Sequence, residues 1–176
     1  YPINVVRCKK CGLVQLDHVV NQSDVYHNSY PYIPSITGVV NQEQKEFWNE
    51  KKGEIWVSLE SKIDKMLGPL GDQAIKILKP KVGEKILDIG CGNGRNMLNP
   101  NYNFIGIDNC IEFIKICTKQ NMNVIQSDMT KIPIKSHSQD AVISIASFHH
   151  LSSNARRLEA LKEMRRIIKS SGKILI

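Results

Sequence analysis

The stretch Asp88-Ile-Gly-Cys-Gly-Asn-Gly94 decides the fold of this chain. A short run from Lys85 to Leu87 leads into the carboxylate, and glycines follow at positions 90, 92 and 94. Glycine tolerates positive φ angles, and it lets a ligand approach the main chain because it has no Cβ atom. Turns of this kind at the carboxyl end of a parallel strand are where open α/β sheets bind ligands. The stretch therefore predicts a buried strand followed by a ligand-binding turn.

Further strands follow at the spacing of a parallel sheet. Phe104–Ile107 runs into Asp108, which is well placed to accept hydrogen bonds from a ribose diol. The other predicted strands are Asn123–Ser127, Asp140–Ala146 and Lys173–Ile176. Alternation with helical segments predicts βαβ units over residues 81–176. A purely structural glycine turn is one alternative; a dinucleotide site is disfavoured because its fingerprint is G-x-G-x-x-G.

This order of motifs resembles the class I S-adenosylmethionine-dependent methyltransferases. The resemblance implies an α/β, Rossmann-like, doubly wound and mainly parallel sheet with S-adenosyl-L-methionine as cofactor. It also implies that Asp128 contacts the adenine amino group, that Met129 lines the ring, and that the residues after Asp140–Ala146 face the methyl group. The cofactor-binding residues expected on this basis are Asp88, Gly90, Cys91, Gly92, Asn93, Gly94, Asp108, Asn109, Asp128, Met129 and Ala146. Cys91 is interpreted as a small packing residue within that turn.

Three segments differ in pattern. Residues 1–40 read as a partial zinc-knuckle-like segment and residues 43–80 as a helical lid or linker. Residues 81–176 form the methyltransferase domain, which we expect to be truncated after its fifth strand. In the lid, Gly68-Pro69 is expected to break the helix, and a shorter helix over Asp72–Leu78 is expected to end at Lys79-Pro80. An apolar fifth strand at a sheet edge is an aggregation hazard unless another segment covers it.

The resemblance differs between these segments. Residues 1–37 look like the zinc module of sugar C-methyltransferases, and residues 48–95, with Trp48-Asn and Gly53-Glu-Ile-Trp56, resemble bacterial methyltransferases of unassigned substrate. Residues 88–176 are similar to the tRNA methyltransferases that esterify a carboxymethyl group on wobble uridine. The carriers are the glycine turn, Ile105–Asp108, Ser144–His150 and Arg156-Arg157-x2-Ala160-Leu161-x-Glu163. The chain is either a natural mosaic or a recombinant.

Two local details bear on the tRNA resemblance. Only about eight residues separate Gly94 from Asn103, fewer than a helical crossover needs, so we expect an abbreviated connection, as in that tRNA family. Arg95-Asn96 departs from the family, which usually has a Lys-Tyr pair there.

The loop Ala146-Ser-Phe-His-His150 lies where the methyl acceptor would bind. It has neither the Asn/Asp-Pro-Pro-aromatic pattern of amine methylation nor a cysteine nucleophile. A carboxylate is already ionised at pH 7 and needs no general base, so a carboxylate acceptor fits best. His149 and His150 are candidates for positioning the acceptor or contacting the reactive end of the cofactor, with a hydrogen-bonded framework role as the alternative. Arg156 and Arg157 are candidates for binding a phosphate or carboxylate, with helix-surface charge as the alternative.

The chain has 176 residues and a net charge of +7, and the basic excess lies almost entirely in residues 81–176. A helix is predicted over Ser152–Ser170 with an apolar side of Leu158, Leu161, Met164 and Ile168. The basic residues Lys162, Arg165, Arg166 and Lys169 share one stripe of it. This stripe is either a solvated face or a surface for a phosphate backbone. No apolar run approaches the ~20 residues that span a bilayer, so no membrane is expected.

Cysteine usage bears on location and metal binding. Five cysteines do not suggest a disulfide framework, which favours a reducing, cytoplasmic setting. Cys8 and Cys11 have the spacing of half a tetrahedral zinc site, and we expect the site to be incomplete in this chain. The tRNA family also implies two partners, tRNA and a small zinc-binding activator subunit that covers a sheet edge. The rival functions are a small-molecule or sugar methyltransferase and a non-catalytic chain that binds only cofactor or a partner.

Overall fold

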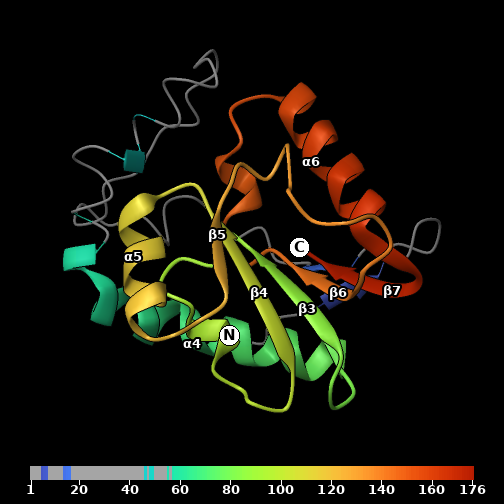
Figure 1. The fold of residues 1–176 in the computed structure, drawn as a ribbon, viewed down its shortest axis with the longest axis horizontal. Coiled ribbons are helices and arrows are strands. Elements are labelled where there is room, and N and C mark those ends of the chain that lie inside the picture. Colours follow the sequence, from blue (N-terminus) through green and yellow to red (C-terminus); the bar gives the residue numbers. More distant parts are fainter. Residues whose placement is uncertain (1–4, 8–13, 17–45, 47, 50–54, 56) are drawn as a thin grey trace.

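The computed structural model describes residues 5–7, 14–16, 46, 48–49, 55 and 57–176. A parallel sheet forms its centre (Figure 1), built from β3 (Lys85–Ile89), β4 (Asn103–Asp108), β5 (Val124–Gln126), β6 (Gln139–Ile143) and β7 (Ile168–Leu175). The hairpin of β1 (Val5–Arg7) and β2 (Val14–Leu16) extends the sheet, giving the order β1-β2-β7-β6-β3-β4-β5. The predicted parallel α/β sheet is confirmed.

The edge of β7 differs from expectation. We expected the last strand to lie at a sheet edge, but β2 pairs with it in parallel through Val14 and Leu175. Its backbone hydrogen-bonding groups therefore have a neighbouring strand at this point, which reduces the aggregation hazard of an edge. Cys8 and Cys11 lie outside the described residues.

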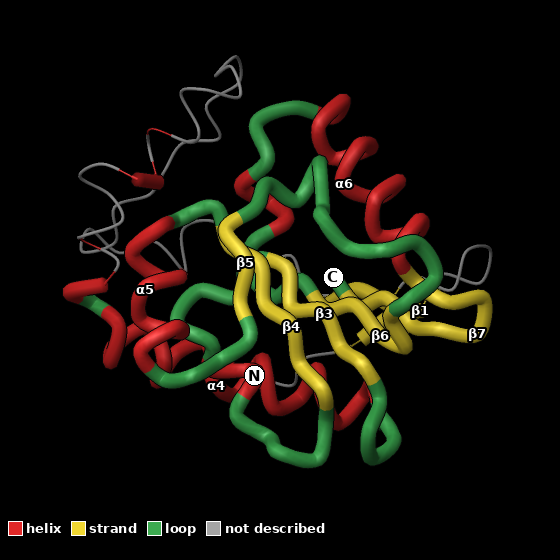
Figure 2. Tube along the Cα trace, in the orientation of Figure 1, coloured by secondary structure: helices red, strands yellow, loops and turns green. Residues whose placement is uncertain are grey.

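Helices cover both faces of the sheet. On one face α4 (Glu60–Leu78) packs through Ala74 and Leu78 on Ile86, Phe104 and Ile143. On the other face α6 (Asn154–Ile167) packs through Met164 and Ile167 on Leu87, Ile89 and Val142. The tube view shows α4 and α6 on opposite sides of the strands, with α5 (Ile111–Lys119) beside β4 and β5 (Figure 2). Successive residues of β3 thus alternate between the two cores, as the pleat of a strand requires.

The predicted break at Gly68-Pro69 is wrong, because α4 runs through Pro69 without interruption. Pro69 lacks the N–H that would bond the carbonyl of Lys65, but Lys65 is exposed, so water can replace that donor. Burial of Ile63 before the proline and of Ala74 after it holds both halves of the helix in place. The predicted end is confirmed: Lys79 adopts a left-handed φ of 47° and donates its N–H to the Ile75 carbonyl.

The short crossover after the glycine turn is confirmed. The chain passes from β3 to β4 through only a single 3-10 turn, η1 (Arg95–Met97). A full crossover helix is absent from this described stretch, and α4 packs against η1 in that region of the sheet. Helix α4, which precedes β3 in the sequence, therefore packs beside the glycine turn.

The buried side of α6 differs from the predicted apolar side. Leu158 is 54% exposed and Leu161 is 37% exposed, whereas Arg156, Ala160 and Ile167 are buried. Ile168 is the first residue of β7, not the last apolar position of the helix. The helix is therefore rotated relative to the predicted apolar side, and only Met164 of the predicted set faces the core from α6.

Candidate functional site

The three glycines of the turn have different neighbours, although all have positive φ (72° for Gly90, 54° for Gly92 and 82° for Gly94). A Cβ on Gly90 would lie 2.3 Å from the Cβ of Ser147, and one on Gly94 would lie 2.2 Å from the Sδ of Met122. Gly90 therefore needs glycine for close packing, whereas at Gly94 the flexible end of Met122 could shift and the positive φ is what favours glycine. A Cβ on Gly92 would meet only the Nη2 of Arg95, at an ordinary contact distance of 3.6 Å. Gly92 is buried, and its positive φ, not a collision, favours glycine at this position.

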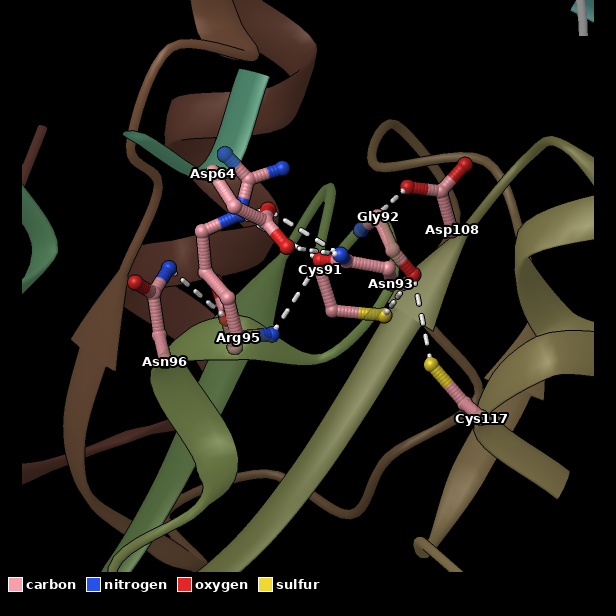
Figure 3. A network of polar contacts seen from close by, with 9 residues as sticks. Asp64, Cys91, Gly92, Asn93, Arg95, Asn96, Asp108 and Cys117 are labelled. Carbon is pink, nitrogen blue, oxygen red and sulfur yellow. Dashed lines mark hydrogen bonds and ion pairs between the residues drawn. The ribbon is translucent and has the colours of Figure 1, made fainter. Parts of the chain in front are cut away.

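Asp108 holds this turn to the end of β4. Its Oδ2 accepts the N–H of Gly92 at 2.9 Å (Figure 3). Its Oδ1 accepts the N–H of Cys110 at 2.8 Å. Burial raises the pKa of this carboxyl group, and the N–H donors of Cys110 and Gly92 partly offset that effect. The side chain predicted to bind a ribose diol therefore lies directly beside Gly92 of the turn.

Asp88 at the end of β3 is fully buried. Its Oδ2 accepts a hydrogen bond of 3.2 Å from Asn96 Nδ2, and its Oδ1 has no hydrogen-bond partner among the described residues. Burial, helped by the negative charge of Asp108, raises the pKa of Asp88 to about 7, against the opposing effects of Asn96 and Arg95. A buried carboxyl group with an unpaired oxygen is costly for the fold alone, so the site has spare capacity for a polar or cationic ligand.

Helix α4 anchors the glycine turn from outside the α/β unit. Asp64 accepts hydrogen bonds from Asn93 Nδ2 at 3.0 and 2.9 Å, and its Oδ1 forms an ion pair of 3.1 Å with Arg95 Nε. Asn93 Oδ1 in turn accepts the backbone N–H and the Nε of Arg95 (Figure 3). This network fixes Asn93 within the turn. The roles of Asp64 and Arg95 were not predicted, because nothing local in the sequence links residues so far apart.

The sulfur atoms near the turn belong to the core. Cys91 is 2% exposed and Cys117 is fully buried, and the Cys117 thiol lies 3.2 Å from the Gly92 carbonyl. Contact with Cys117 and burial raise the pKa of the Cys91 thiol, so it stays protonated at neutral pH. The structure places Cys91 against Gly106 of β4, consistent with a small packing residue.

The loop after β5 places Asp128 in an ion pair. Its Oδ2 lies 2.7 Å from Arg156 Nη2, and its Oδ1 accepts the N–H and the hydroxyl of Thr130. Burial acts to raise the pKa of Asp128, but Thr130 and Arg156 outweigh it and the net pKa is lowered. The alternative of surface charge for Arg156 is wrong, because its side chain is only 9% exposed. Met129 is partly buried against the core under α6.

The loop after β6 contains the expected acceptor-side residues. Ala146 has a φ of 55°, an unfavourable angle for a residue with a Cβ. The hydroxyl of Ser147 donates to the Ile89 carbonyl at 2.7 Å and so joins this loop to β3. The 3-10 turn η2 (Phe148–His150) follows, with the rings of His149 and His150 4.0 Å apart.

Both histidines of η2 are neutral at physiological pH. Desolvation and the charge of His149 lower the pKa of His150 to about 4. Desolvation and the charge of Arg157 lower the pKa of His149 as well. Arg157 is half-buried and donates to Asn154 Oδ1 at 2.8 Å. The pair can therefore donate or accept hydrogen bonds without carrying a positive charge.

The basic stripe predicted on α6 is divided in the structure. Lys162 and Arg165 are exposed. Arg166 instead donates to the Ile132 and Ile134 carbonyls and pairs with Glu163 at 2.7 Å, while Lys169 lies in β7 and pairs with Asp140 at 2.6 Å. Arg166 and Lys169 therefore have structural partners.

Two further observations concern metals and membranes. Within the described residues, no three or more histidine, cysteine, aspartate or glutamate side chains gather as they would around a metal ion. In the same part of the chain, no helix combines the length and apolar character needed to cross a membrane.

The fold and the glycine turn beside Asp108 define a class I, Rossmann-like methyltransferase domain. The family model described as "Methyltransferase domain" matches residues 87–176, and the chain belongs to this family.

Relatives of this chain include tRNA (carboxymethyluridine(34)-5-O)-methyltransferases. That of Arabidopsis thaliana is 44% identical over 95 residues, which are 53% of this chain and 24% of the relative. That of Schizosaccharomyces pombe is 39% identical over 108 residues, 61% of this chain and 46% of the relative. The chain thus spans less than half the length of either relative.

Solved structures share the fold. A chain in the complex of the Haloferax volcanii Trm112 methyltransferase activator with its partner has a TM-score of 0.62 at 19% identity, covering 74% of this chain and 57% of that one. The YcgJ protein of Bacillus subtilis has a TM-score of 0.54 at 24% identity, covering 60% and 48%.

Proposed function

We propose that this chain binds S-adenosylmethionine at the glycine turn and transfers its methyl group to a carboxymethyl group on the wobble uridine of tRNA. The observation that carries this proposal is the 44% identity to a methyltransferase named for that reaction. We place the activity in the cytoplasm, as expected from the cysteine usage.

The residues of the site fit this cofactor. Apart from its chain neighbours, no backbone atom of the described residues lies within 4 Å of a Cβ built on Gly92, so its main chain suits a close approach by the cofactor, and Asp108 lies beside it for a ribose diol. The unpaired Oδ1 of Asp88 provides a buried acceptor close to the same turn. We assign Asp128 and Met129 to contacts with the adenine. Asn93 in the glycine turn and Asn109 in the loop after β4 are also assigned to cofactor binding. Ala146 is assigned to the side of the site that faces the methyl group. In this assignment Asp128 contacts the ligand while it remains paired with Arg156.

S-adenosylmethionine would supply a methyl group carried on a sulfonium sulfur. An ionised carboxylate oxygen of the acceptor would attack that methyl carbon in line, so that the O–CH₃ bond would form as the S–CH₃ bond breaks and S-adenosylhomocysteine leaves, with no proton transferred. His149 and His150 would then orient the acceptor rather than deprotonate it. Their lowered pKa values suit this role, because a neutral ring donates a hydrogen bond without neutralising the nucleophile by ion pairing. Proximity and orientation supply most of the rate enhancement.

The exposed charges near α6 support a nucleic-acid substrate. Arg166 and Glu163 bind the backbone of the β5–β6 loop, and that loop carries the exposed residues Lys131 and Lys135, while Lys162 and Arg165 are exposed on α6. We propose that these four residues form one surface, the basic face (Lys131, Lys135, Lys162 and Arg165). Such a surface binds phosphates through counterion release.

Methyl transfer tests the proposal. The chain is incubated with S-adenosylmethionine carrying a labelled methyl group and with tRNA that either has or lacks carboxymethyluridine at the wobble position. We expect label only in the modified tRNA, in an alkali-labile ester, and none with Asp108→Ala. Label in small acids or nucleotide sugars, with none in tRNA, would replace the proposed acceptor. The absence of label from any acceptor, despite cofactor binding, would favour a chain that only binds.

Charge reversal tests the basic face separately. The double variant Lys162→Glu and Arg165→Glu should weaken tRNA binding and reduce the slope of affinity against salt by about 2. The matched control is Lys62→Glu with Lys65→Glu, two exposed positions on α4 across the sheet. Equal losses in both double variants would mean that only net charge matters.

The proposed partner is a small activator subunit, as the resemblance to the tRNA family implies. On the described sheet β5 is the terminal strand opposite the β1–β2 hairpin. None of the described strands pairs with its outer edge, and an edge of this kind can accept a strand from a partner. Zinc would be bound by that partner or by Cys8 and Cys11. Co-expression with a candidate activator, followed by gel filtration, tests for the complex.

A further inference from the structure

Two consecutive residues of the N-terminal segment contact two different loops of the site. Asn49 uses both ends of its amide on the loop after β4: its Oδ1 accepts the N–H of Ile111 at 2.8 Å, and its Nδ2 donates to the Asn109 carbonyl at 3.0 Å. A side-chain amide has a donor and an acceptor at its two ends, which is what these two contacts use. The contacts join residues about 60 positions apart.

The contact at Ile111 satisfies the start of a helix. The first N–H groups of a helix have no partner within it, and the N-cap residue of α5, Cys110, makes no side-chain capping bond. Asn49 supplies that cap from a distant part of the chain. Asn109 directly follows Asp108, so the same amide fixes the loop that carries the candidate ribose-binding carboxylate.

Trp48 reaches the opposite loop. Its ring lies edge-on to His150 with a centroid distance of 5.1 Å. His150 belongs to η2, after β6, on the side assigned to the methyl acceptor. An edge-to-face arrangement is favourable for two rings because the positive edge of one meets the negative face of the other. Neighbouring side chains therefore hold the loops after β4 and β6, which lie on either side of β3 and its glycine turn.

We propose that Trp48 and Asn49 are positioning residues that form a strap across the candidate site, and that this strap couples cofactor binding at the β4 loop to the placement of His150. The roles of the two loops rest on the proposed function. Asn49 holds the loop after β4, on the cofactor side of the site, and the adjacent Trp48 holds His150 on the acceptor side. Cofactor binding should therefore be sensed at Trp48.

Calorimetric titration with S-adenosylhomocysteine tests the Asn49 half. Asn49→Ala removes both hydrogen bonds and should weaken binding about tenfold, equivalent to about 1.4 kcal/mol. Asn49→Asp keeps the acceptor for Ile111 but places an oxygen against the Asn109 carbonyl, so it should weaken binding as well. Asn101→Ala is the matched control, because Asn101 is exposed and lies before the amino-terminal end of β4, at the other end of the strand from Asp108.

Tryptophan fluorescence tests the coupling. The chain has two tryptophans, so Trp56→Phe leaves Trp48 as the sole reporter. We expect a saturable change in Trp48 emission during titration with S-adenosylhomocysteine, with the midpoint found by calorimetry. The change should be lost in His150→Ala and reduced in Asn49→Ala at saturating ligand. A role in stability alone would not produce a ligand-dependent signal that passes through His150.

The outcomes separate this inference from the proposed function. Tight binding by Asn49→Ala, or bound ligand without any change in Trp48 emission, overturns the strap. An emission change that persists in His150→Ala also overturns it, because Trp48 then senses the ligand directly. Failure of the unsubstituted chain to bind S-adenosylhomocysteine refutes the cofactor assignment and the strap together. Failure to methylate tRNA affects only the acceptor, since neither readout uses tRNA.

Discussion

Replacement of Asp88 by asparagine should stabilise the fold in a pH-dependent way. The pKa of Asp88 is 3.8 in an unperturbed chain and about 7 in the buried site. Between these values the unfolded chain has released its proton while the folded protein retains it. The free energy of unfolding of the parent therefore falls as pH rises from about 4 to about 7. The difference of about 3 pKa units corresponds to about 4 kcal/mol in total.

Asp88→Asn removes that pH-dependent cost because an amide does not ionise. Part of the gain is offset, since one amide group can be left without a partner at the Oδ1 position, at about 1–3 kcal/mol. That offset is the same at every pH. The stability of the variant relative to the parent should therefore improve by about 2–3 kcal/mol between pH 5 and pH 8.

Urea unfolding of both proteins at pH 5, 6, 7 and 8 measures this difference. His150 titrates in both proteins, and its opposite contribution at acid pH cancels in the comparison. A difference in unfolding free energy that stays constant from pH 5 to pH 8 would show that Asp88 does not titrate with a raised pKa in the folded protein. Calorimetry with S-adenosylhomocysteine on the same samples should show weaker binding by the variant, since the carboxylate is assigned to the site.

Other substitutions test the surrounding structure. Asp128→Asn should have the opposite pH profile: its destabilisation should be present above about pH 4 and disappear as pH falls through the lowered pKa, measured by urea unfolding. Gly90→Ala should lower the free energy of unfolding by about 2–4 kcal/mol, because Gly90 has a positive φ and the new Cβ would collide with Ser147. Gly83 also has a positive φ, but the Cβ of Gly83→Ala would meet no atom of the described residues within 4 Å, so this variant should lower the free energy of unfolding by only about 1–2 kcal/mol in the same urea experiment. Arg166→Ala should lower the unfolding free energy by about 2–3 kcal/mol and speed amide exchange in residues 131–138, while the exposed Arg165→Ala should change it by less than about 0.5.

The glycine turn and the short crossover could be predicted because local rules govern them. Three glycines at alternate positions after a strand permit few conformations, and the eight residues before Asn103 leave too little chain for a helix. Asp108 could be placed because strand ends in a parallel sheet meet at one edge.

The orientation of α6 could not be predicted as reliably. Its apolar residues fit two faces, and the sequence does not indicate that Arg156 is buried by pairing with Asp128. Because Arg156 lies on the buried side of α6, the helix is rotated relative to the prediction, and Leu158 is left on the surface. Pro69 was similarly misleading, because tertiary packing on both sides of it outweighs one lost hydrogen bond.

The contacts that close the site depend on long-range geometry. Asn49 caps α5, and Asp64 holds Asn93, across separations that no periodicity or motif encodes. Trp48-Asn could be singled out from a resemblance, but its two partners became evident only in the fold.

Calorimetric titration of the unsubstituted chain with S-adenosylhomocysteine, compared with Asp108→Ala, tests whether the cofactor binds at the glycine turn. We expect saturable binding of roughly micromolar affinity, about −8 kcal/mol, that is lost in Asp108→Ala. No binding by a folded sample, or equal binding by Asp108→Ala, would contradict the assignment of the cofactor to the turn beside Asp108.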